Sequence, residues 1–106
     1  MSKITKEAAC EETARTIANL ALTIRRASAA IASDPANTDL YQPLQTVLLA
    51  EHRLYRQFLS ALETDNADEC YRIGGQLEAL GRQIDKLISA IRRRRGRSGG
   101  TNRWPN

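Results

Sequence analysis

The stretch CYRIGGQLEALGRQIDKLISAI, residues 70–91, decides the fold class of this chain. Its apolar residues recur at the three- and four-residue spacing that lines one face of an α-helix, in a heptad pattern. The whole chain has fifteen Ala, twelve Leu and eight Ile against a single Val, a composition that favours helix over strand. We therefore predict an all-α protein. The heptad consists of Cys70, Ile73, Leu77, Leu80, Ile84, Leu87 and Ile91, with Ile88 beside them.

The helix that carries this heptad is predicted to cover residues 67–95. Asn66 is followed three residues later by Glu69, a capping box that marks the start of a helix. Gly96 is expected to cap the other end, where four arginines complement the negative pole of the helix dipole. The remaining residues, 96–106, are rich in Ser, Gly and Asn, and we predict that they form a disordered basic tail.

A long helix is also predicted at the start of the chain. Apolar residues recur there every seven positions, which predicts a helix over residues 3–33, capped by Ser2 or Thr5. It should end before Pro35, because the residue that precedes a proline is forced out of the α region.

A second helix is predicted over residues 40–63. Asp39 and Gln42 resemble a capping box, and Pro43 would fall in the first turn, where its missing N–H costs little. Three helices joined by short turns favour an up-down-up bundle, so we predict one domain over residues 1–95 with a coiled-coil-like core.

This topology separates the charges along the bundle. One end should carry both cysteines together with Glu7, Glu11, Glu12, Glu63, Asp65, Asp68 and Glu69. The opposite end should carry Arg25, Arg26, Arg82, Lys86 and the run Arg92 to Arg95. The sequence therefore predicts a rod with one acidic end and one basic end.

Self-association is predicted from the thin core. The first helix is rich in alanine, which buries much less apolar area than leucine, so we expect a homo-oligomer. Gly74, Gly75 and Gly81 lie within the third helix, where each glycine costs up to about 1 kcal/mol relative to alanine. Either an alanine-rich helix approaches Gly74 and Gly81 closely, or the helix kinks at Gly74 and Gly75. Both interpretations stay open.

The strongest functional signal is the arginine-rich C-terminus. Residues 1–91 carry ten basic and twelve acidic side chains, whereas residues 92–106 carry six arginines and no acid. Such a segment predicts binding to DNA or RNA phosphates without sequence specificity, because no recognition motif accompanies it. A charge cluster that only confers solubility is the alternative. The residues predicted to bind nucleic acid are Arg92, Arg93, Arg94, Arg95, Arg97, Arg25 and Arg26. This prediction requires that the bundle's own carboxylates do not neutralise them.

The only tryptophan lies in the predicted tail. Trp104 stands between Arg103 and Pro105, and a rigid aromatic in a short basic segment is suited to anchor the tail in a groove of a partner protein. We therefore predict a partner-binding role for Arg103 and Trp104, with incidental placement as the alternative.

No catalytic, metal or cofactor site is predicted. Glu51 and His52 have no nucleophile at a useful spacing, so we interpret them as a solvent-exposed edge of the second helix. A zinc site needs about four ligands, and His52 is the only histidine. Cys10 and Cys70 occupy core positions and are expected to be buried thiols, with a disulfide between them as the alternative. Without a long apolar stretch or a signal-like N-terminus, we expect a soluble cytoplasmic protein with no membrane partner.

Two functions remain open at this point. The first is a non-enzymatic, oligomeric adaptor that binds nucleic acid or a nucleic-acid machine; in shape and charge alone it is similar to small DNA-packaging subunits of viral or gene-transfer systems. The second is a chaperone or inhibitor that grips a partner helix with an apolar face, for which residues 59–87 are suited.

Overall fold

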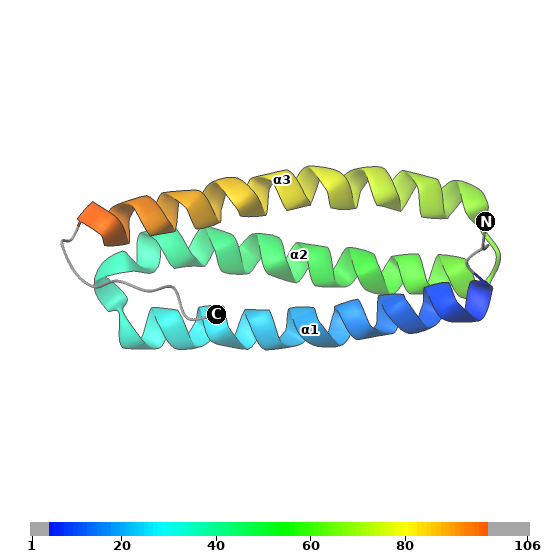
Figure 1. Ribbon diagram of the computed structural model, residues 1–106, viewed down its shortest axis with the longest axis horizontal. Coiled ribbons are helices and arrows are strands. Elements are labelled where there is room, and N and C mark those ends of the chain that lie inside the picture. The colour runs from blue at the N-terminus through cyan, green and yellow to red at the C-terminus, as the bar shows by residue number, and fades with distance from the viewer. Residues whose placement is uncertain (1–4, 98–106) are drawn as a thin grey trace.

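The computed structural model describes residues 5–97, which form three long α-helices joined by two tight corners (Figure 1). Helix α1 covers Lys6–Ser33, α2 covers Thr38–Glu63 and α3 covers Ala67–Arg97, with a short 3₁₀ turn, η1, at Pro35–Asn37. The chain runs up, down and up. The prediction of an all-α, three-helix bundle is confirmed.

Two of the predicted caps are confirmed, although α1 begins at Lys6 and not at residue 3, because Thr5 is the cap. The Thr5 hydroxyl accepts a hydrogen bond from the amide of Ala8 at 3.1 Å and so caps α1. The Asn66 side-chain oxygen accepts one from the amide of Glu69 at 3.2 Å at the start of α3. These bonds satisfy amide donors that have no partner within the helix. The alternative cap, Ser2, lies outside the described residues.

Helix α2 departs from the prediction at its start. It begins at Thr38, two residues early, and Asn37 rather than Asp39 occupies the capping position without a side-chain capping bond. The reason is η1, in which the amide of Asn37 donates to the Asp34 carbonyl and already winds the chain into a helical turn. Pro43 consequently lies in the second turn of α2 and not in the first.

The end of α3 also departs from the prediction. The helix continues through Gly96 to Arg97, so Gly96 is not a C-terminal cap. The rest of the predicted tail, residues 98–106, lies outside the described part of the chain.

Helix α2 lies between the other two helices and holds them together (Figure 1). Both α1 and α3 pack along α2, but no Cα atom of α1 comes within 8 Å of one of α3. The molecule is a rod 50 Å long with a radius of gyration of 16.3 Å, whereas about 13 Å is typical of a compact domain of this length.

The most deeply buried cluster lies near the α1–α2 corner. It consists of Ala27 from α1, Tyr41, Leu44 and Leu48 from α2, and Ile91 from α3. Within the predicted apolar stripes, Ile73 and Ile91 of α3 are fully buried. Most other stripe residues that pack against this cluster stay half-buried, because the backbones of α1 and α3 approach α2 more closely than they approach each other. The half-buried members include Leu20, Ile24, Ile31, Ile84, Leu87 and Ile88.

The glycines of α3 are not sites of close helix approach within this chain. A Cβ atom added at Gly74, Gly75 or Gly81 would meet no atom of another part of the described chain within 4 Å. The interpretation that the alanine-rich α1 packs against these positions is therefore wrong for a single chain. The backbones of α1 and α3 stay more than 8 Å apart at their Cα atoms, which leaves open space beside these glycines.

This open space predicts that Gly81→Ala stabilises the protein. Alanine has no steric conflict at this position and is favoured over glycine in a helix interior, so the free energy of unfolding should rise by about 0.5–1 kcal/mol. Urea unfolding followed by circular dichroism at low protein concentration measures this. A loss of stability would show instead that another chain packs against Gly81.

Candidate nucleic-acid interface

The basic end of the bundle is the end where α1 finishes, α2 begins and α3 finishes. Arg25 and Arg26 on α1 and Arg92 and Arg93 on α3 are exposed, and none of the four has a hydrogen bond or ion pair with another described residue. Each guanidinium presents its donors to solvent in the fork geometry that suits phosphate oxygens.

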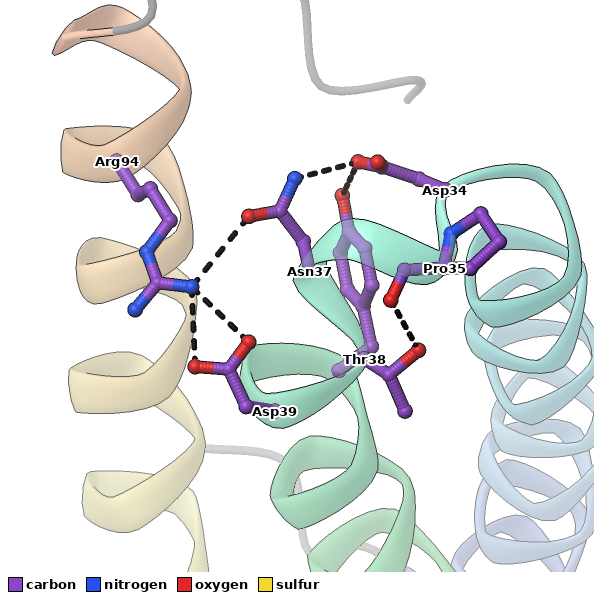
Figure 2. Close-up of polar contacts among 7 residues, drawn as sticks. Asp34, Pro35, Asn37, Thr38, Asp39 and Arg94 are labelled. Carbon is purple, nitrogen blue, oxygen red and sulfur yellow. Dashed lines mark hydrogen bonds and ion pairs between the residues drawn. The ribbon is translucent and has the colours of Figure 1, made fainter.

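Unlike these four arginines, Arg94 forms an ion pair with a carboxylate of the bundle. Its Nη1 atom lies 3.0 Å from both carboxylate oxygens of Asp39, in the first turn of α2, and 3.4 Å from the Asn37 side-chain oxygen (Figure 2). The side chains of Arg94 and Asp39 are 45% and 63% exposed. Solvent screens such a pair, which is worth about 0–1 kcal/mol.

Arg95 makes a more buried set of contacts. Its Nη1 atom donates to the hydroxyl of Tyr41 at 2.7 Å and lies 3.6 Å from a carboxylate oxygen of Asp34. The same Asp34 oxygen accepts a hydrogen bond from the side-chain Nδ2 of Asn37 at 2.8 Å and from the Tyr41 hydroxyl at 3.4 Å. Tyr41 is fully buried, so this network ties the last turn of α3 to the α1–α2 corner.

The structure therefore divides the predicted arginine cluster into two parts. Arg94 and Arg95 are paired with the bundle's own carboxylates, and the sequence did not predict these pairs. The pairs form because antiparallel packing brings the end of α3 beside the start of α2, where Asp39 lies. The side chain of Arg97, and both Arg103 and Trp104, lie outside the described residues.

Sequence reasoning missed Asp34 and Asp39 as partners of the arginines. Asp39 was interpreted as a cap, and Asp34 only as the residue that precedes Pro35 at the end of the first helix. A usable signal existed, because the residues flanking the α1–α2 corner must lie beside the end of α3 in an up-down-up bundle. Acids at this corner were therefore the natural partners of the arginine run.

The two ion pairs also decide which arginines of the basic end have a carboxylate partner. They occupy Asp34 and Asp39, the carboxylates of the α1–α2 corner, and leave Arg25, Arg26, Arg92 and Arg93 without nearby compensation. The opposite end, where α1 begins and α2 meets α3, is called the acidic end. It carries exposed carboxylates that have no ion-pair partner among the described residues: Glu7, Glu12, Glu63 and Asp68.

Glu51 and His52 are not the solvent-exposed edge that the sequence predicted. Both are half-buried on α2, because α2 has a helix on either side and therefore a wide contact face. Burial raises the pKa of the Glu51 carboxyl above its usual value. Burial, followed by the negative charge of Glu51, also raises the pKa of Tyr55 one turn later.

The raised pKa of Glu51 predicts a pH-dependent gain in stability for Glu51→Gln. The folded state binds the Glu51 proton more tightly than the unfolded state, so the charged carboxylate destabilises the fold as pH rises above about 4.5. We expect the variant to have a higher melting temperature than the parent at pH 7, and the difference to vanish below pH 4. Thermal unfolding across this range measures it. The same difference in melting temperature at pH 7 and below pH 4 would show that the charge of Glu51 is not its cause.

Within residues 5–97, no three His, Cys, Asp or Glu side chains gather where they could hold a metal ion, and no helix is long and apolar enough to cross a membrane. Cys10 and Cys70 are both half-buried free thiols. No protein-family model matches the sequence, and comparisons with curated proteins and with solved structures gave no significant match.

Proposed function

We propose that this protein is a non-enzymatic helical adaptor that binds the phosphate backbone of nucleic acid through its basic end. The observation that carries the proposal is the set of exposed arginines, Arg25, Arg26, Arg92 and Arg93, which no described carboxylate neutralises. Arg97 and Arg103 add two positive charges close by in the sequence. Arg94 and Arg95 have a structural role in this proposal, because they hold the end of α3 against the corner.

The chemistry of the basic end favours backbone phosphates over bases. Phosphate contacts supply affinity that depends on salt but carry no sequence information. Four arginines that all contact duplex phosphates would give a log-log salt slope of about 3.6. Binding should therefore be tight at low salt, weak at moderate salt and indifferent to sequence.

Oligomerisation is the second part of the proposed function. The half-buried apolar stripes of α1 and α3 offer area for self-association. An oligomer would present several basic ends to one nucleic acid, and each added contact would raise the overall affinity by effective concentration. A ring or cluster of such rods would fit the role of a small subunit in DNA packaging.

The proposal is tested by removing the exposed arginines in pairs. We expect Arg92→Ala/Arg93→Ala and Arg25→Ala/Arg26→Ala each to reduce the salt slope by about 2 and to weaken binding at every sequence tested. Fluorescence anisotropy with labelled duplex DNA, single-stranded DNA and RNA, over a series of salt concentrations, measures both quantities. Arg53→Ala/Arg56→Ala is the matched control, because it removes two exposed arginines of α2 and leaves the basic end intact.

A complementary variant tests the role of the internal pairs. Asp39→Ala removes a negative charge from the basic end and takes the carboxylate away from Arg94, so its affinity for duplex DNA should rise. Equal losses in the control and in the two basic-end variants would refute the assigned interface. If the parent protein binds no nucleic acid at low salt, the proposed adaptor function is refuted. The chaperone or inhibitor function, in which the apolar face of residues 59–87 binds a helix of a partner protein, is then favoured.

A further inference from the structure

An open apolar hollow lies at the acidic end of the bundle, between the start of α1, the end of α2 and the start of α3. Its volume is about 560 Å³, within the size range of sites that hold a large aromatic side chain or a small ligand. The ion pair between Lys6 and Asp65, at 3.1 Å, lies on its rim. Its apolar wall is formed by Ala9, Phe58, Ala61, Leu62, Ala67 and Cys70.

The side of this hollow carries an exposed aromatic residue. Tyr71 lines the hollow and is 89% exposed, the most exposed large apolar side chain among the described residues. An apolar hollow bordered by an exposed tyrosine has the features of an anchor site, since aromatic residues dominate the energetics of such contacts.

The chain's own C-terminal segment cannot reach this hollow. Cys70 and Arg97 are separated by 27 helical residues of α3, which is about 40 Å at 1.5 Å per residue. The seven residues from Arg97 to Trp104 span at most about 25 Å when fully extended. Trp104 therefore falls short of the hollow of its own chain, and only a second copy can bring it there.

We propose that the C-terminal segment of a second copy, residues 98–106, docks in this hollow with Trp104 as its anchor. Trp104 supplies the only indole in the chain, and Arg103 places a positive charge directly beside it. The acidic end supplies matching negative charge from Glu7 and Asp68, which have no ion-pair partner among the described residues. The hollow thus offers an apolar surface to Trp104, and the acidic end offers carboxylates to Arg103.

The arrangement is reciprocal in an antiparallel pair of rods. Two copies that lie head to tail bring the basic end of each beside the acidic end of the other, so both C-terminal segments can dock at once in a symmetric dimer. The opposite net charges of the two ends favour this orientation over the parallel one. The experiments that follow contain no nucleic acid, so their outcome is distinguishable from that of the test of nucleic-acid binding.

The single tryptophan makes the proposal directly measurable. We expect the emission of Trp104 in the full chain to shift to shorter wavelength as the protein concentration rises, in step with dimer formation measured by sedimentation. Trp104→Ala should weaken dimerisation by about thirtyfold for each docked segment, the loss expected when a hot-spot aromatic is truncated, and by about a thousandfold in a dimer that docks two. A shift already complete at the lowest concentration would show docking within one chain, and no shift at all would show an exposed tail; either result overturns the proposal.

A second experiment locates the docking site. The full-length Trp104→Ala variant serves as the receptor, and a peptide of residues 98–106 serves as the probe, so the peptide contributes the only tryptophan signal. Binding should be saturable and should be lost when Ala9→Phe fills the hollow. Ala18→Phe is the matched control, because Ala18 is an exposed alanine of the same helix that does not line the hollow. Equal binding to both phenylalanine variants would place the segment elsewhere and refute the proposal.

Discussion

Tyr41→Ala is expected to lower the free energy of unfolding by about 3–5 kcal/mol, the range found when a buried aromatic is truncated. Tyr41 is fully buried and packs with Ala27, Leu44, Leu48 and Ile91, so its ring joins all three helices. Its loss would leave a cavity in the most deeply buried cluster of the bundle. Because small domains are stable by only about 5–15 kcal/mol, the variant should be strongly destabilised in urea titrations followed by circular dichroism.

Two matched variants make this result interpretable. Tyr71→Ala removes the same side chain from an exposed position on α3 and should change the stability by less than about 0.5 kcal/mol in dilute solution. Tyr41→Phe keeps the ring and removes only the hydroxyl that contacts Arg95 and Asp34, so it should cost about 1–2 kcal/mol and remain measurable if the alanine variant does not fold. Equal effects of the two alanine variants would show that the cluster is not the centre of stability.

Asp34→Ala is expected to destabilise the protein by about 1–3 kcal/mol, and Asp39→Ala by less than about 1 kcal/mol. Asp34 is two-thirds buried and its carboxylate faces Arg95, Asn37 and Tyr41 together, so its removal leaves donors without an acceptor in a region with little water. Asp39 faces Arg94 in a pair that is half exposed, where solvent replaces the lost contact. Urea unfolding of both variants under the same conditions measures the difference.

The salt dependence of the two variants provides the control. High salt should reduce the effect of Asp39→Ala towards zero, because exposed pairs are screened, and should leave most of the effect of Asp34→Ala in place. A larger loss for Asp39→Ala than for Asp34→Ala would contradict the assignment of Arg95 and Asp34 as the central contact of the corner.

The helices were predictable because their signals are local. The heptad of residues 70–91 and the stop at Pro35 act within a few residues of the chain, and both appear in the structure as expected. The cap at Thr5 is equally local. The start of α2 was not predictable in the same way, since η1 offered the backbone of Asn37 a helical turn that competed with capping by Asp39.

The candidate site was only partly predictable. That Arg25, Arg26, Arg92 and Arg93 are exposed near one end follows from helix periodicity and the up-down-up topology. That Arg94 and Arg95 face the bundle also follows from the heptad, because the spacing of Ile84, Ile88 and Ile91 continues onto positions 94 and 95. That Asp39 and Asp34 are their partners depends on how the α1–α2 corner packs against the end of α3. The hollow near Phe58 was not predictable for a related reason, since it depends on how closely α1 and α3 approach α2.

By itself, the sequence determined three helices, their order along the chain and the separation of charge between the two ends, because helix periodicity, capping and net charge are properties of neighbouring residues. Only the tertiary structure decided that α1 and α3 stay apart, that half of the arginine run is neutralised and that an apolar hollow opens at the acidic end. Those features depend on distances between residues that are far apart in the chain, and these distances are determined by how the three helices pack against one another.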